Sequence, residues 1–202
     1  MAGRFKVGTK LVAGVGLNDG TYPAVKTKEH DLWRSMLARS YTDRNLKLKP
    51  AYVGCTVSDN FKNYTYFYEW CNSQIGFKKY DENNRMFALD KDLLQKGNKI
   101  YSENTCVFVP MEINNLIVKS DSLRGDLPVG VMYDKARDKF QSQMWVNNKR
   151  MFLGRFNTAE EAFFKYKESK EQHIKTVANK WKGLIDYKAY EALINYEVEI
   201  TD

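Results

Sequence analysis

The sequence predicts an α+β protein, and three stretches of the chain support this class. Residues 85–116 have the pattern of a strand that ends in acidic residues, a loop, a second strand and a helix. Residues 127–182 have the pattern of a three-stranded antiparallel sheet followed by one helix. Between residues 30 and 73, apolar and aromatic side chains recur at helical spacing. Two modules are therefore expected, 1–118 and 127–182, with the polar residues 119–126 as a linker.

The charge of the 202-residue chain is positive and unevenly spread. The net charge is +7, from 32 basic and 25 acidic side chains. Residues 1–120 carry 18 basic and 12 acidic side chains, residues 121–182 carry 13 and 8, and the tail 183–202 carries 1 and 5. Two basic blocks followed by an acidic tail indicate a polyanionic partner for the body of the protein.

Composition argues against several classes of protein. The three cysteines, Cys55, Cys71 and Cys106, include no C-x-x-C pair, which favours buried reduced thiols over a zinc site. The two histidines, His30 and His173, leave little scope for histidine catalysis. No apolar run is long enough to cross a bilayer, and residues 1–10 lack the apolar core of a signal peptide. A cytoplasmic protein that binds no membrane is expected.

The N-terminal elements follow from local patterns. Residues 1–29 alternate apolar and polar side chains around Asp19-Gly20, which predicts a hairpin with its turn there. His30–Tyr41 should form a core helix with a basic outer side. A short strand is expected within 51–61. A second helix follows, and its aromatic stripe has helical spacing, which favours a core role over base stacking; the stripe comprises Phe61, Tyr64, Phe67, Tyr68 and Cys71.

Four motifs in the first 120 residues resemble the small HNH-type homing endonucleases of phages. They are AGVGLNDG at 13–20, W-x-x-M-L-x-R-x-Y at 33–41, YVGCTV at 52–57 and LDKDLLQKGNKIYSENTCVFVPMEINN at 89–115. The resemblance implies a ββα-metal module over 1–118 that hydrolyses DNA phosphodiesters with Mg²⁺ or Mn²⁺. It also implies action in the cytoplasm of a bacterial host cell.

The same resemblance places the candidate catalytic residues in the strand–loop–strand–helix stretch at 85–116, which is called the hairpin below. Asp90 and Asn114 fall at the metal-ligand positions, Lys91 at the general-base position and Thr105 where the family has its central asparagine. A carboxylate and an amide oxygen suit Mg²⁺. A lysine must be desolvated before it acts as a base, so either Asp92 replaces it or the site is inactive. The alternative is a solvated strand end that binds nothing.

Local patterns also predict the elements of the C-terminal part, residues 127–202. Alternating side chains predict a strand over 139–146, a turn at 147–149 and a strand over 150–156. Thr158 and Glu161 form a predicted capping box at the start of a helix. Residues 183–202 should contain a short closing helix. The inner side of the long helix is expected to carry Ala162, Phe163, Tyr166, Ile174, Val177 and Trp181.

This module resembles the APETALA-two/ethylene-response-factor DNA-binding domain. The segment GVMYDKARDKFQSQMWVNNKRMFLGRFNTAEEAFFKY at 130–166 carries the resemblance, and LGRFNTAEEA is its strongest part. The resemblance implies that the sheet enters the major groove of double-stranded DNA. Lys139 and Arg150 keep the basic type of the family. Gln143 replaces an acid, Trp145 an arginine and Phe152 a tryptophan, so base preference does not carry over.

The chemistry of the sheet face supports DNA contact without the family. Arg150 can bind guanine through two hydrogen bonds, and Gln141 and Gln143 can pair with adenine. Three further cations, Lys139, Lys149 and Arg155, can neutralise phosphates. The alternative is an ordinary solvated sheet face.

Three functions are consistent with these patterns. The first is a phage-type, site-specific and metal-dependent DNA endonuclease that binds its target through the C-terminal sheet. The second is a catalytically degenerate DNA-binding or regulatory protein, because Lys91 stands where the family has its histidine and Thr105 where it has its central asparagine. The third is an RNA-binding protein, because basic aromatic surfaces also suit single strands.

Overall fold

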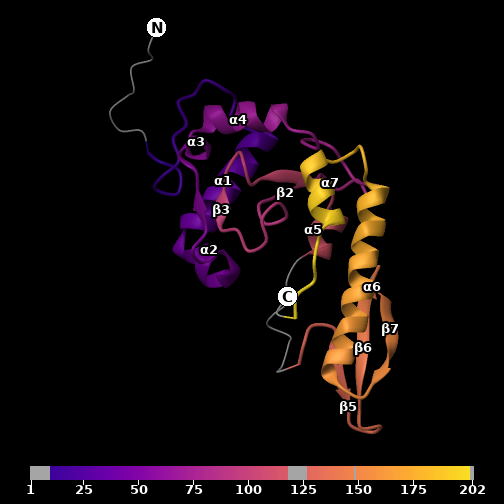
Figure 1. The fold of residues 1–202 in the computed structure, drawn as a ribbon. Coiled ribbons are helices and arrows are strands. Elements are labelled where there is room, and N and C mark those ends of the chain that lie inside the picture. The colour runs from indigo at the N-terminus through magenta and orange to yellow at the C-terminus, as the bar shows by residue number, and fades with distance from the viewer. Residues whose placement is uncertain (1–9, 118–126, 148, 201–202) are drawn as a thin grey trace. The chain divides into compact units, whose positions relative to one another are not determined.

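The chain forms two compact units. The computed structural model describes residues 10–117, 127–147 and 149–200 (Figure 1). The first unit comprises Met1–Asn114 with Gly183–Ala189, and the second comprises Asn115–Lys182 with Tyr190–Asp202. The linker expected at 119–126 lies outside the described residues.

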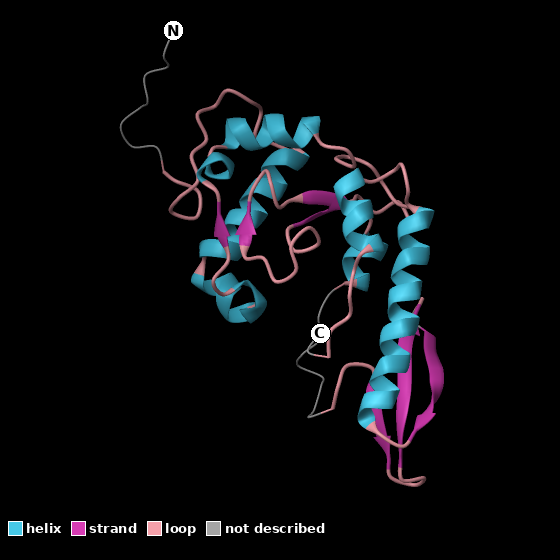
Figure 2. Ribbon diagram, viewed as in Figure 1, coloured by secondary structure: helices cyan, strands magenta, loops and turns pink. Residues whose placement is uncertain are grey.

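Helices dominate the first unit (Figure 2). They are α1 (Lys28–Tyr41), α2 (Asp43–Leu48), the 3-10 helix η1 (Pro50–Tyr52), α3 (Asp59–Lys62) and α4 (Tyr64–Ser73). The hydroxyl of Thr27 caps α1 by accepting a hydrogen bond from the His30 N–H at 3.4 Å. The core role predicted for the aromatic stripe is confirmed for Phe61, Tyr64, Phe67 and Cys71, which are buried, whereas Tyr68 is only half-buried. Trp33 and Trp70 are buried in the same region.

The first unit also contains the predicted strand–loop–strand–helix. Strand β2 (Ala88–Asp90) pairs antiparallel with β4 (Val107–Val109), and α5 (Met111–Leu116) follows β4 directly. A second pairing was not expected from the sequence: β1 (Thr56–Val57) runs parallel to β3 (Ile100–Tyr101), which lies in the loop between β2 and β4.

The hairpin predicted around Asp19-Gly20 is wrong for residues 10–27, the described part of the N-terminal stretch. Within that part, one bridge joins Val12 to Gly16 through hydrogen bonds of 2.9 and 2.8 Å, and Leu17 bridges to Asn63 outside it. The chain turns earlier than expected because Ala13 and Gly14 both adopt positive φ. At the expected turn, Asn18 accepts a hydrogen bond from the Gly20 N–H at 3.0 Å, which bends a loop rather than joining two strands.

The second unit is a three-stranded antiparallel sheet covered by one helix, as predicted. The strands β5 (Val131–Asp134), β6 (Lys139–Val146) and β7 (Lys149–Phe156) lie in the order β5-β6-β7. Helix α6 (Ala159–Lys180) contacts all three strands, and α7 (Tyr187–Ile194) is the predicted closing helix. The capping box of Thr158 and Glu161 is present at the start of α6.

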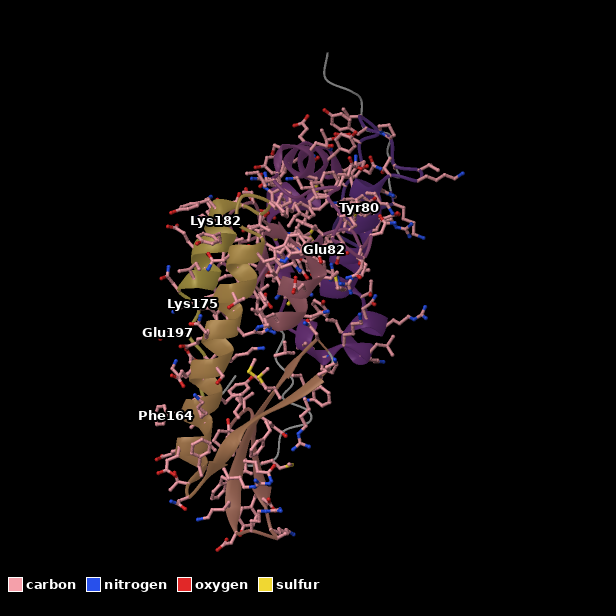
Figure 3. All side chains as sticks on the ribbon, turned by 90° about the vertical axis from the view of Figure 1, so that its right-hand side faces the viewer. Tyr80, Glu82, Phe164, Lys175, Lys182 and Glu197 are labelled. Carbon is pink, nitrogen blue, oxygen red and sulfur yellow. The ribbon has the colours of Figure 1, made fainter. Side chains whose placement is uncertain are left out.

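One face of the sheet is covered by α6. Ser142 and Met144 on β6 are buried, as are all six α6 and C-cap side chains predicted for the inner side. The contact is close at Gly130, where a Cβ atom would lie 2.1 Å from the Tyr166 ring. On the opposite side of α6, Phe164 is 64% exposed and points away from the sheet (Figure 3).

Two composition-based expectations can be compared with the described residues. All three cysteines are buried free thiols, and burial raises the pKa of Cys106 to about 12. Within the described ranges, no helix has both the length and the apolar character needed to cross a membrane.

Candidate nucleic-acid interface and candidate metal site

The pairing of β6 with β5 and β7 gathers seven of the eight predicted DNA-contacting residues on one face. Paired residues of antiparallel strands point to the same side of a sheet. Gln141 pairs with Arg155, Gln143 with Phe152 and Trp145 with Arg150, while Lys139 pairs with Asp134 of β5. We call the resulting surface the outer face; it comprises Asp134, Lys139, Gln141, Gln143, Trp145, Arg150, Phe152 and Arg155. The eighth predicted residue, Lys149, pairs with Val146 and stands exposed at the end of the β6–β7 hairpin.

A bulge in β7 lets residues on both sides of it point to the outer face. Ser142 pairs with Gly154 and Gln143 with Phe152, so Leu153 is an extra residue in β7. In a regular strand with Leu153 in the alternation, Arg155 would lie three residues after Phe152 and so on the opposite side. The bulge therefore brings Arg155 to the outer face together with Arg150.

The outer face exposes large aromatic side chains beside cations. Trp145 is 65% and Phe152 51% exposed, although burying such side chains normally stabilises a fold by about 1.5–3 kcal/mol each. The guanidinium carbon of Arg155 lies 4.9 Å from the centre of the Phe152 ring, within the range of a cation–π interaction. Exposed aromatic and basic groups side by side are suited to bases and phosphates.

Asp134 is a member of the outer face that the sequence analysis missed. Its Oδ2 atom accepts hydrogen bonds from Gln141 Nε2 at 2.6 Å, Arg155 Nε at 3.3 Å and an Arg137 terminal nitrogen at 3.3 Å. Desolvation alone would raise the pKa of Asp134, but these hydrogen bonds outweigh it and lower that pKa below its ordinary value. Asp134 is therefore an ionised acceptor at neutral pH.

Gln141 and Gln143 differ in how free they are to meet a base. Gln141 is only 9% exposed and donates to Asp134, so its predicted contact with adenine would require it to leave that carboxylate. Gln143 is half-buried, and its Oε1 atom is buried without a hydrogen-bond partner within the described residues. Gln143 is therefore the glutamine with an unused acceptor, and its carboxamide would have to turn outward to meet a base.

In the first unit, Asp90 occupies the end of β2 with one carboxylate oxygen engaged. Its Oδ1 atom accepts hydrogen bonds from the backbone N–H groups of Asp92 at 2.8 Å and Leu93 at 2.7 Å. Burial raises the pKa of Asp90, and these two hydrogen bonds only partly oppose that effect. The second oxygen, Oδ2, has no partner within the described part of the chain. The carboxylate is thus fixed in orientation with one free oxygen.

Lys91, the predicted general base, is held inside the hairpin. It is 7% exposed, and its ammonium group donates to Asp92 and to the Asn98 carbonyl oxygen at 3.0 Å. The same nitrogen lies 5.7 Å from the centre of the Tyr101 ring. To act as a base, this buried ammonium group would first have to lose a proton. Asp92, half exposed, is the other predicted base and is the one within reach of solvent.

Asn98 organises this loop, a role that the sequence analysis did not predict. The buried Asn98 carboxamide donates to the carbonyl oxygens of Lys91 at 2.8 Å and Ile100 at 2.7 Å, and accepts from the Ile100 N–H at 3.1 Å. Thr105, at the expected central-asparagine position, also donates to the Ile100 carbonyl oxygen at 2.7 Å. Asn98 and Thr105 together fix the loop that follows Asp90.

Asn114 is the second predicted metal ligand. It lies in α5 and is half-buried, and its carboxamide makes no hydrogen bond with another described residue. Across residues 10–117, 127–147 and 149–200, no three His, Cys, Asp or Glu side chains are grouped as a metal site. Asp90 and Asn114 offer two oxygen donors, and Mg²⁺ commonly takes its remaining ligands from water and phosphate. The donor chemistry therefore fits a hard divalent cation.

Comparison with known proteins identifies no relative. No family model, no curated protein and no solved structure matches the chain. Membership in the nuclease family and in the DNA-binding family remains a prediction, and the two candidate sites provide the basis for a functional proposal.

Proposed function

We propose that the protein is a site-specific DNA endonuclease, acting in the cytoplasm of a bacterial host cell. The outer face of the sheet would bind duplex DNA, and the β2–β4–α5 hairpin would cleave it with Mg²⁺ or Mn²⁺. The observation that carries the proposal is the outer face itself. Its exposed aromatic and basic side chains lie together on the side of the sheet that α6 does not cover.

The sheet has the chemistry for the major groove, which is wide enough to admit strands. Arg150 is exposed and can donate two hydrogen bonds to guanine, and Gln143 can pair with adenine. Lys139, Lys149 and Arg155 would contact phosphates, which sets affinity and register rather than sequence. Trp145 and Phe152 would supply apolar contact with thymine methyl groups or sugars.

The hairpin has residues suited to metal-dependent hydrolysis. Asp90 and Asn114 would hold the cation through their free oxygen atoms. When bound, a divalent cation polarises the scissile phosphate and stabilises the leaving oxygen. Asp92 would accept a proton from the attacking water, and Lys91 would hold the Asp92 carboxylate in place through their hydrogen bond.

One observation favours a second function, that of a DNA-binding protein without nuclease activity. The ammonium group of Lys91 is occupied by Asp92 and by the Asn98 carbonyl oxygen, so the residue at the general-base position has a structural role. In that case the protein would act as a regulator by occupying its site.

The decisive experiment incubates the full-length protein with duplex DNA from its own source, in Mg²⁺, Mn²⁺ or chelator, and maps breaks on both strands. Metal-dependent breaks at one or a few positions would support the endonuclease. Tight duplex binding without breaks would support the regulator. Preferential binding of single-stranded RNA in a competition assay would contradict both and favour an RNA-binding protein.

Metal binding can be tested separately from cleavage. A cation that binds the folded state raises the midpoint of thermal unfolding. Mg²⁺ or Mn²⁺ should therefore raise the midpoint of the wild-type protein more than that of Asp90→Asn. An equal shift in both proteins would remove Asp90 from the metal site.

A further inference from the structure

Asp134 is an acidic residue on a face that otherwise carries cations, glutamines and aromatic rings. We propose that Asp134 determines sequence specificity, by accepting a hydrogen bond from the exocyclic amino group of a cytosine or an adenine and by penalising the other bases. This inference rests on the proposed binding of duplex DNA by the outer face.

The contacts of Asp134 without DNA show what DNA would disturb. Three donors converge on its Oδ2 atom, from Gln141, Arg155 and Arg137. Its own side chain is only 10% exposed, whereas those of Arg155 and Arg137 are 40% and 60% exposed. The two arginines are therefore the movable partners, and Gln141 is the fixed one.

DNA would compete for these arginines. Phosphate oxygens bind arginine through short, charge-assisted hydrogen bonds, and Arg137 and Arg155 are accessible enough to turn toward a phosphate. Once they do, the ionised Asp134 carboxylate loses both cationic partners and is covered by the bound DNA instead of by water. A buried charge without partners is costly.

The size of this free-energy cost depends on which base lies opposite Asp134. The amino groups N4 of cytosine and N6 of adenine can donate to the carboxylate in the major groove. Guanine O6 and thymine O4 are acceptors, so they would repel the carboxylate. Discrimination arises from a repulsive element as much as from an attractive one.

A purely structural role for Asp134 makes a different prediction. If the carboxylate only joins β5 to Gln141 and Arg155, its removal should destabilise the sheet and weaken binding to all sequences alike. If it selects bases, its removal should strengthen binding to unrelated DNA and flatten the preference at one position.

The test compares Asp134→Asn with Asp138→Asn in the full-length protein. Both replacements remove one negative charge from the β5–β6 region. Asp138 lies in the turn at φ +50, a conformation that asparagine tolerates, and accepts a hydrogen bond from the Tyr133 hydroxyl at 2.5 Å. Each protein is used to select from a randomised duplex library, and its affinity is measured for the selected duplex and for a mixed-sequence duplex.

For the wild type and Asp138→Asn, we expect a cytosine or adenine to be enriched at one position, and its identity distinguishes the two amino groups. For Asp134→Asn, we expect that enrichment to disappear and the ratio of selected to mixed-sequence affinity to fall roughly 5- to 100-fold, the range of one good base contact. The same motif and ratio in wild type and Asp134→Asn, or equal losses in the two variants, would overturn the inference. Failure of the wild type to bind any duplex would instead overturn the proposed function.

Discussion

The loop between β2 and β4 and the outer face of the sheet differ in where their side chains point. In the loop, Lys91 and Asn98 direct their hydrogen bonds inward to backbone carbonyl oxygens. On the sheet, Trp145, Arg150 and Phe152 are exposed. Lys91 and Asn98 thus maintain a backbone shape, whereas Trp145, Arg150 and Phe152 are available to a partner. The hairpin leaves few groups for chemistry, chiefly the free oxygens of Asp90 and Asn114.

The largest expected effect concerns Asp90. Asp90→Asn keeps an oxygen for the Asp92 and Leu93 N–H groups but removes the negative charge from the proposed metal site. Metal-dependent cleavage should fall by more than the roughly 10- to 100-fold that loss of an outer-sphere partner costs, with duplex affinity nearly unchanged. Asp59→Asn, at a carboxylate that is 97% exposed, is the matched control. Cleavage that survives in Asp90→Asn would show that the hairpin is not the active site.

The same substitution should change the pH dependence of stability. Burial raises the pKa of Asp90, so ionisation of this carboxyl opposes folding. Its favourable contribution is present at low pH and is lost as pH rises through the folded-state pKa. Without metal, Asp90→Asn should therefore be more stable than the wild type at pH 7, with a smaller difference near pH 4. Thermal unfolding at both pH values measures this, and a variant less stable at pH 7 would contradict it.

On the sheet, the largest effect should come from Arg150. Arg150→Ala should weaken binding to the selected duplex by roughly 1–3 kcal/mol and relax base preference at one position, if Arg150 contacts guanine. Equilibrium titration of selected and single-substituted duplexes measures both quantities. Because Arg150 is exposed, its removal should leave thermal stability unchanged. An unchanged affinity would remove Arg150 from the interface.

The sequence predicted the elements of both regions but not the contacts that distinguish them. Alternation along β6 and the capping box at Thr158 are local signals, and they gave the sheet and α6 correctly. Asp134 was missed because its role depends on Arg155, which is 21 residues away and reaches the outer face through a bulge. The pairing of β5 with β6 across their short turn was the available signal, since it places Asp134 opposite Lys139.

For the β2–β4–α5 hairpin, too, the sequence predicted the main elements but not the tertiary contacts. The spacing of motifs predicted β2, β4 and α5, and the short strand expected within 51–61 is present as β1. The two-residue strand β3 is too short to give a pattern of its own. Lys91 was assigned as the general base through the resemblance to the nuclease family. Its burial is a tertiary property, set by Asn98 and Tyr101, which no local pattern reports.

Substitution of Asn98 tests whether its side-chain hydrogen bonds stabilise the loop between β2 and β4. Asn98→Ala would leave the carbonyl oxygens of Lys91 and Ile100 without this donor, which typically costs about 1–3 kcal/mol. Hydrogen exchange of the amides at 91–106 should become faster by the corresponding factor. Asn104→Ala, at an exposed position in the same loop, is the control. Equal exchange in the two variants would mean that Asn98 does not organise the loop.

The smallest effect should come from Lys149, which stands beside Arg150 but at the hairpin end. If Lys149 contacts only a phosphate, Lys149→Ala should weaken selected and mixed-sequence duplexes equally. The slope of the logarithm of affinity against the logarithm of salt concentration should drop by about 0.9, the value for one phosphate contact. Lys165→Ala, on α6, should leave the slope unchanged, since Lys165 pairs with Glu168 at 2.7 Å. A loss of base preference in Lys149→Ala would instead place this lysine among the base-reading residues, and extend the interface past the edge of the outer face.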